Sequence, residues 1–81
     1  MILMQYYGGI REFTKCKEEA VAAATLGEAM EYVKNKYGKQ ALKAMKASML
    51  TLDGVRIERL KPRLPLPEGS AVGVFPLCCG G

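Results

Sequence analysis

The sequence predicts one small α+β domain, in which a few short strands pack against one main helix. Three observations support this prediction. The chain starts with an almost continuously apolar run at 1–7, a helix cap and an apolar stripe occupy 25–37, and an Asp-Gly turn at 53–54 separates two short runs that are typical of strands. A chain of 81 residues fits a single domain. It buries only about 60% of the surface that it exposes when unfolded, which leaves little room for an internal substrate pocket.

Composition and charge narrow the classes of function. The chain is 49% hydrophobic and 25% charged, and no apolar run approaches the roughly 18 residues that span a bilayer. The start lacks the basic region of a signal peptide, so we expect a cytoplasmic protein with no membrane partner. Twelve Lys and Arg against eight Asp and Glu give a net charge of +4. Because the basic residues are spread along the chain, we expect a solvated basic face and no nucleic-acid partner.

The cysteines and the lack of histidine argue against metal sites and disulfides. Cys16, Cys78 and Cys79 give neither a disulfide framework nor the spacing of a zinc site. The sequence has no His, which is the commonest general base and metal ligand. We therefore expect reduced thiols, no metal, no bound cofactor, and a protein that is not itself an enzyme.

The start of the chain is predicted to form a hairpin of two strands. Residues 1–7 are almost continuously apolar or aromatic and are followed by two glycines, which suits a buried strand that ends in a turn. The Ala-rich stretch before Thr25 has high helix propensity on its own. Since a helix cap follows at Thr25, we instead predict a second strand at 20–24, paired with the first. Arg11 and Glu12 are interpreted as a charged pair that closes the connection between these strands.

Two helices are predicted next. Thr25 and Glu28 form a capping box, in which the Thr hydroxyl accepts the Glu28 amide and the Glu carboxylate reaches back to the Thr25 amide. Gly38 stands where a C-cap glycine belongs, and a shorter helix is predicted at 40–47. The side chains expected to face the core are Leu26, Met30, Val33 and Tyr37 in the first helix, and Leu42 and Met45 in the second.

The second half of the chain is predicted to form a hairpin and a final strand. The runs at 49–52 and 55–58 flank Asp53-Gly54, which favours a two-residue type I′ turn. The prolines that follow exclude helix and central strand, so an irregular connection should lead to a turn at 67–69. A short apolar strand at 71–75 ends the predicted sheet.

The last residues are predicted to form a tail. After Pro76 the sequence holds only the residues Leu77, Cys78, Cys79, Gly80 and Gly81. None of their side chains is charged or able to cap, so we divide the chain into a domain at 1–76 and a flexible, exposed C-terminal tail at 77–81. With nine Gly in 81 residues, a terminal Gly-Gly has a chance probability of roughly one in eighty, which favours a functional tail.

Three stretches of the sequence resemble one known family. Residues 7–13, Tyr-Gly-Gly-Ile-Arg-Glu-Phe, are similar to that family's segment after its first strand. The Asp-Gly hairpin at 50–55 is similar to a family hairpin that is usually written with Asn-Gly. Residues 64–76 are the most specific match. They resemble the family's pattern of a leucine, an acidic-Gly turn, an apolar strand and then a Pro just before the tail. The chain thus resembles the ThiS/MoaD family of sulfur carriers of thiamine and molybdopterin synthesis.

The resemblance implies a ubiquitin-like β-grasp fold, with a mixed sheet of about four or five strands packed on one main helix. It implies that an E1-like enzyme adenylates the Gly81 carboxylate with ATP, and that a sulfurtransferase or persulfide donor then gives a thiocarboxylate. A sulfur-accepting synthase subunit would take the sulfur in molybdopterin-, tungstopterin- or thiamine-type cofactor synthesis or in metabolite synthesis. Two departures leave the pathway open: Leu77-Cys78-Cys79 replaces the usual tail residues, and 39–46 is unusually basic.

The residues near the C-terminus are assigned separate roles. Gly80 and Gly81 lack Cβ atoms, so they can thread as an extended strand into a narrow channel of the adenylating enzyme. Phe75, Pro76 and Leu77 are interpreted as a docking surface for that enzyme, a role compatible with a place at the edge of the core.

Cys78 and Cys79 leave two interpretations open. One thiol could assist sulfur handling by accepting a persulfide or by forming a disulfide with the partner. Both could instead only fill small apolar positions, which we favour because an exposed thiol in a mobile tail has modest reactivity.

Two alternatives to a sulfur carrier also stay open. The first is a ubiquitin-like modifier that is conjugated to lysines of other proteins through Gly81. The second is a small basic module that binds its partner without covalent chemistry. The two covalent functions require the Gly-Gly end, whereas the binding module does not.

Overall fold

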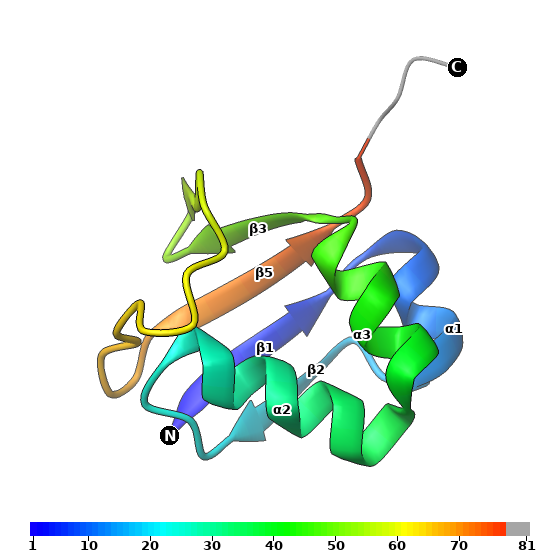
Figure 1. Cartoon of the computed structure of the whole chain (residues 1–81), viewed down its shortest axis with the longest axis horizontal. Coiled ribbons are helices and arrows are strands. Elements are labelled where there is room, and N and C mark those ends of the chain that lie inside the picture. The colour runs from blue at the N-terminus through cyan, green and yellow to red at the C-terminus, as the bar shows by residue number, and fades with distance from the viewer. Residues whose placement is uncertain (78–81) are drawn as a thin grey trace.

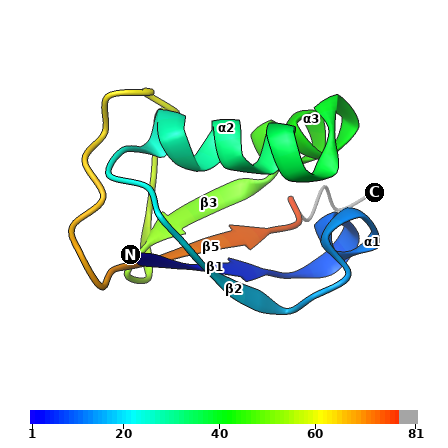
Figure 2. The same cartoon turned by 90° about the horizontal axis from the view of Figure 1, so that it is seen from below.

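A five-stranded mixed sheet forms one layer of the structure and two helices form the other (Figures 1 and 2). The computed structural model describes residues 1–77. The strands are β1 (Ile2–Tyr6), β2 (Glu18–Val21), β3 (Met49–Leu52), β4 (Val55–Arg56) and β5 (Ala71–Phe75). They lie in the order β2-β1-β5-β3-β4, with β1 and β5 parallel at the centre and the other pairs antiparallel. This arrangement confirms the predicted β-grasp fold class.

Helix α2 (Leu26–Tyr37) covers one face of the sheet, and the shorter α3 (Lys39–Lys46) lies beside it (Figure 2). Thr25 caps α2 as predicted, since its hydroxyl accepts a hydrogen bond from the Glu28 amide at 3.3 Å. The carboxylate of Glu28 accepts from the amide of Ala24 at 2.8 Å, and not from that of Thr25 as the capping box predicted. Thr25 is extended (φ −136°, ψ 162°), which brings the preceding amide within reach of this carboxylate.

The second strand lies earlier in the chain than the prediction of 20–24. The register of β1 and β2 pairs Ile2 with Val21, and β1 begins at Ile2, so no partner is left for the residues after Val21. The chain therefore leaves the sheet at Val21 and crosses towards α2. There the carbonyl of Ala24 accepts a hydrogen bond from the amide of Leu66 at 2.8 Å.

The connection between β1 and β2 is helical, which was not predicted. A 3-10 turn, η1 (Gly8–Ile10), leads into the short helix α1 (Arg11–Thr14), and buried Ile10 anchors this segment to the core. Arg11 and Glu12 are exposed, and within residues 1–77 neither forms an ion pair. Their interpretation as a charged pair that closes the connection is wrong, because packing of Ile10 performs that role.

The second half of the chain follows its predictions closely. Asp53 and Gly54 have φ of 49° and 85°, both positive as a type I′ turn requires. Strand β5 has the predicted bounds, and α3 is displaced by one residue from the predicted 40–47. Strand β4 ends at Arg56 and not at residue 58. The segment after it leaves the sheet to reach the start of α2, where the Gly27 amide donates to the Pro62 carbonyl at 2.9 Å.

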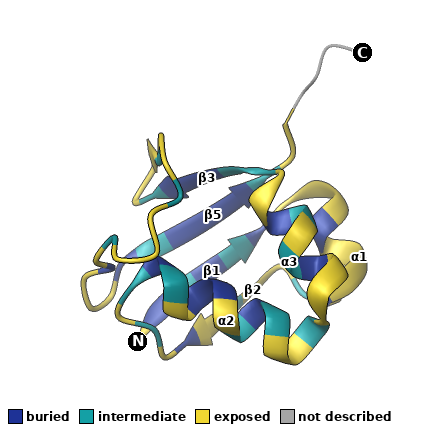
Figure 3. Cartoon of the chain, viewed as in Figure 1, coloured by how far each residue is buried: buried dark blue, intermediate teal, exposed yellow. Residues whose placement is uncertain are grey.

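The hydrophobic core lies between the sheet and the helices (Figure 3). Alternation along β1 and β5 places every second side chain towards α2 and α3. The predicted core residues of α2 are buried, apart from Tyr37, which is half-buried; α3 buries Ala41 and Met45, whereas Leu42 is half-buried. The largest fully buried side chains are Tyr6, Ile2, Met4, Leu26, Met45, Leu50, Val21, Val33, Val72 and Val74.

A matched pair of substitutions tests this assignment of the core. Val74→Ala removes two methyl groups from a side chain that is 0% exposed, so we expect the free energy of unfolding to fall by about 2 kcal/mol. Val55→Ala makes the same chemical change at a side chain that is 70% exposed, and we expect a change below about 0.5 kcal/mol. Urea denaturation followed by circular dichroism measures both. Equal losses in the two variants would contradict the assignment.

Candidate functional site

Strand β5 carries the chain to the predicted docking residues. Phe75 ends the strand opposite Met49 of β3, and Pro76 and Leu77 follow on the surface, with Leu77 51% exposed. The candidate site therefore has a defined base at the end of the central strand. The roles predicted beyond that base fall on residues outside the described part of the chain, namely Cys78, Cys79, Gly80 and Gly81.

The ring of Phe75 stacks on the ring of Tyr7. The two rings are nearly parallel, at 9°, with centroids 4.4 Å apart. Val74 faces the helices, so Phe75 lies on the opposite face of the sheet. A Cβ atom at Gly73 would lie 2.6 Å from the Phe75 ring, so the absence of a side chain there lets the ring lie close to the sheet. Tyr7 was not predicted as a site residue, since only the parallel pairing of β1 with β5 brings it to Phe75.

Gly8 forms the second contact at the base of the tail. Its φ is +72°, and a Cβ atom built on it would lie 2.8 Å from Cγ of Pro76. The start of η1 therefore lies directly against the first residue after β5. The amide of Tyr7 also donates to the carbonyl of Val74 at 2.9 Å. Tyr7 and Gly8, which directly follow β1, thus contact the chain where it leaves β5 and set its direction there.

Among residues 1–77 no set of catalytic groups accompanies this site. No group of three or more His, Cys, Asp or Glu side chains in that range could hold a metal ion. Cys16, which was assigned no role, lies on the far side of β1, where its sulfur is 3.9 Å from the hydroxyl of Tyr37. None of the helices in the described range has the length and apolar character needed to cross a membrane.

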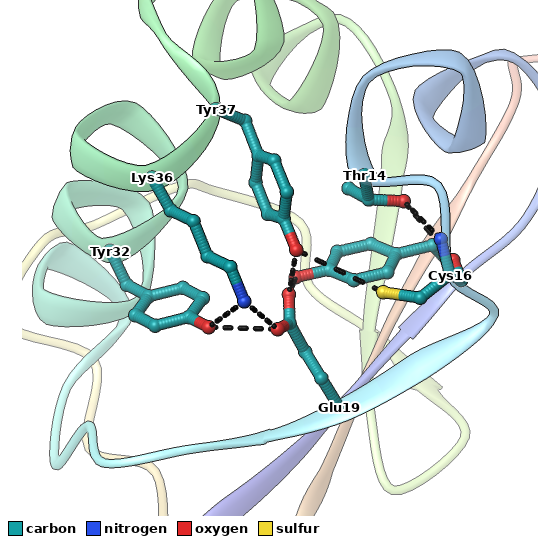
Figure 4. A network of polar contacts seen from close by, with 7 residues as sticks. Thr14, Cys16, Glu19, Tyr32, Lys36 and Tyr37 are labelled. Carbon is teal, nitrogen blue, oxygen red and sulfur yellow. Dashed lines mark hydrogen bonds and ion pairs between the residues drawn. The ribbon is translucent and has the colours of Figure 1, made fainter.

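A polar cluster around Glu19 was not predicted from the sequence (Figure 4). The carboxylate of Glu19, on edge strand β2, points towards α2 and is 14% exposed. It accepts hydrogen bonds from three tyrosine hydroxyls and one ammonium group: Tyr6 at 2.7 Å, Tyr32 at 2.8 Å, Tyr37 at 2.6 Å and Lys36 at 2.8 Å. The cluster therefore joins the edge of the sheet to the helix layer.

The ionisation of the cluster follows from these contacts. Burial by itself would raise the pKa of Glu19, but the hydrogen bonds from Lys36 and the tyrosines outweigh it and lower that pKa to about 2. Burial and then the bond to Glu19 raise the pKa of Tyr6, and the bond to Glu19 raises the pKa of Lys36. At neutral pH the carboxylate is charged and all its partners donate to it. Because its acceptor positions are occupied, the cluster is structural and offers no place for a substrate.

The sheet order, the single main helix and the exposed end of β5 define a ubiquitin-like β-grasp protein. No protein-family model matches the sequence, and no curated protein sequence matches it. Solved structures do match, over almost the whole chain. Their identities are low, so they show a shared fold.

Three of these similar structures illustrate the likeness. A chain of the complex of subunits 1 and 2 of molybdopterin-converting factor from Helicobacter pylori has a TM-score of 0.72 and 22% identity, with 99% of this chain and 97% of that chain covered. A chain of the BexX/CysO complex of Amycolatopsis orientalis has a TM-score of 0.81 and 12% identity, with both chains covered completely. SAMP1 from Haloferax volcanii, a small archaeal modifier protein, has a TM-score of 0.70 and 14% identity, with 99% and 98% covered.

Replacing Glu19 tests the structural role of the cluster. Glu19→Gln removes the charge that four donors share, so we expect the free energy of unfolding at pH 7 to fall by about 2 kcal/mol. Glu18→Gln, at the exposed neighbour on the same strand, is the matched control and should change it by less than about 0.5 kcal/mol. Urea denaturation measures both variants.

The same pair of variants gives a pH dependence. The pKa of Glu19 is lower in the folded chain than its ordinary value of 4.5, so its contribution is complete above that value and is lost as the pH falls towards about 2. The difference between the wild type and Glu19→Gln should therefore shrink between about pH 5 and pH 2. A difference that stays constant over this interval would show that the charge of Glu19 is not what stabilises the fold.

Proposed function

We propose that this chain is a sulfur carrier that works through the carboxylate of Gly81. An E1-like partner adenylates that carboxylate with ATP, and sulfur transfer converts it into a thiocarboxylate that serves cofactor or metabolite biosynthesis. The observation that carries the proposal is the stack of exposed Tyr7 on half-buried Phe75 at the end of β5, directly before a sequence that ends in Gly-Gly. The shared fold with a chain of molybdopterin-converting factor supports it.

The proposed chemistry needs only a carboxylate from this chain. A carboxylate is a poor electrophile, so one of its oxygens first attacks the α-phosphate of ATP and pyrophosphate leaves. The terminal sulfur of a persulfide then attacks the acyl carbon and AMP leaves. A thiol reductant cleaves the resulting S–S bond, which gives the thiocarboxylate and a disulfide. Since the sequence has no His, the acid and base steps fall to the partner, and this chain acts as a co-substrate.

The docking surface in this proposal consists of Tyr7, Phe75, Pro76 and Leu77. Tyr7 is 40% exposed although its ring is already stacked, so little side-chain entropy is lost when a partner covers it. Aromatic side chains of this kind are frequent anchors at the centre of interfaces. Gly80 and Gly81 would then follow this surface into the channel of the enzyme, where side chains would obstruct passage.

A protein modifier is the second candidate function, and the likeness to the small archaeal modifier protein SAMP1 favours it. Both functions share the adenylation step. Mass spectrometry of the protein from its native cells separates them. An intact mass with one oxygen replaced by sulfur supports the carrier, whereas branched Gly-Gly remnants on lysines of other proteins support the modifier.

Deletion of Gly80 and Gly81 tests both covalent functions. We expect complete loss of ATP–pyrophosphate exchange with the adenylating enzyme and of sulfur loading, because the reacting carboxylate would no longer reach the active site. Unfolding should be unchanged, since the buried core ends at Val74. A chain extended by one Ala after Gly81 is the control for the position of the carboxylate and should also be inactive. Full partner binding and unchanged activity after the deletion would instead support a non-covalent module.

Substitution of both tail cysteines tests their part in sulfur handling. We expect the double variant Cys78→Ser, Cys79→Ser to load sulfur at the wild-type rate, because neither thiol is needed when the donor is a partner's persulfide. A reconstituted assay that follows the intact mass over time measures the rate. A clear fall in loading, with adenylation unchanged, would assign one of these thiols to sulfur transfer.

A further inference from the structure

A group of exposed basic residues lies on the two helices near the end of β5. We define the α1/α3 basic face by five exposed cations on or next to these two helices, namely Arg11, Lys15, Lys39, Lys43 and Lys46. Glu12 is the one carboxylate on these segments. The remaining seven basic and seven acidic residues of the sequence balance, so this face carries a charge equal to the +4 of the whole chain.

Helices α1 and α3 lie at the end of the molecule where β5 ends (Figures 1 and 2). Helix α3 leads directly into β3, whose first residue, Met49, lies opposite Phe75. Gly8, which opens the segment that leads to α1, lies against Pro76. The two helices therefore stand at the same end of the molecule as the exposed residues of the docking surface.

Local stability accounts for only part of the positive charge of α3. Lys43 and Lys46 lie in its last turn, where the helix dipole favours cations, whereas Lys39 does not. The three lysines recur at i, i+4 and i+7, on the exposed side of a helix whose other side buries Ala41 and Met45. Lys39 occupies the first turn, where the helix dipole disfavours a cation, and that turn has no acidic residue. In the described range 1–77, none of the three lysines of α3 takes part in an ion pair.

We propose that the α1/α3 basic face docks on an acidic surface of the adenylating enzyme, next to the channel that receives the tail. This proposal rests on the proposed function. A protein partner is favoured over RNA because α1 and α3 lie at the end of β5, from which the chain continues to the residues that enter the enzyme in the proposed function. A surface beside that end of the strand therefore also approaches the enzyme. Complementary charge raises the rate of encounter and leaves the chemical step unchanged. The basic face thus governs capture of the carrier, and the carboxylate governs its reaction.

A pair of triple variants with equal charge tests the proposal. Lys39→Glu, Lys43→Glu and Lys46→Glu together reverse the charge of α3. Arg56→Glu, Arg59→Glu and Lys61→Glu make the same change in net charge on β4 and the loop after it, away from the tail (Figure 1). The assay is ATP–pyrophosphate exchange by the adenylating enzyme purified from the source cells. Urea denaturation of both variants verifies that they fold.

At low ionic strength we expect the α3 variant to raise the KM for the carrier about tenfold with kcat unchanged, and the control to raise it by less than about twofold. The KM of the wild type should rise with salt, whereas that of the α3 variant should hardly change. The uncharged variant Lys43→Gln, Lys46→Gln should give a smaller rise in KM than the triple reversal.

Several results would overturn the proposal. A KM that is unchanged in the α3 variant rejects the docking surface, and equal increases in both triple variants show that only net charge matters. Binding of total RNA that is lost in the α3 variant, with KM unchanged, assigns the face to RNA. If the wild type supports no ATP–pyrophosphate exchange, the proposed function itself is wrong. If exchange occurs with the same KM in the wild type and the α3 variant, only the docking surface is wrong.

Discussion

The parallel pairing of β1 with β5 is the interaction on which the rest of the structure depends. It joins Leu3 to Ala71 and Tyr6 to Val74, so the first and the last strands lie side by side at the centre of the sheet. Closing a loop of this length costs conformational entropy, which burial of the apolar side chains of both strands offsets. Because β1 ends beside the end of β5, Tyr7 and Gly8 lie at the base of the tail. The candidate site is thus a product of this one pairing.

The edge of the sheet needs a separate attachment, which Glu19 provides. Strand β2 has only four residues and one neighbouring strand, so its backbone hydrogen bonds alone hold it weakly. The carboxylate of Glu19 connects it to Tyr32, Lys36 and Tyr37 of α2. A charged group in this position costs desolvation, and several donors are required to offset that cost. The attachment of β2 to α2 is therefore polar, whereas the core between the sheet and the helices is formed by hydrophobic side chains.

Features with a local cause could be predicted from the sequence, and those with a distant cause could not. The cap at Thr25 and the turn at Asp53-Gly54 depend on neighbouring residues only, and the structure contains both. The bounds of β2 depend on where β1 begins, which its own Ala-rich sequence does not reveal. Glu19 acquires its partners only when β2 meets α2, although Tyr32, Lys36 and Tyr37 on one side of a helix were a readable signal. In the same way, the proposed docking role of Phe75, Pro76 and Leu77 could be predicted from their position at the end of the last strand, whereas that of Tyr7 could not.

The position of β5 also has a mechanical consequence. An enzyme that grips residues beyond Leu77 and pulls would load β5 along its own length. The strand is paired on both sides, with β1 and with β3, so its ladder hydrogen bonds would bear the load together in shear and would not open one after another. A domain built this way can be held by one end of its chain, and later released, without losing its fold.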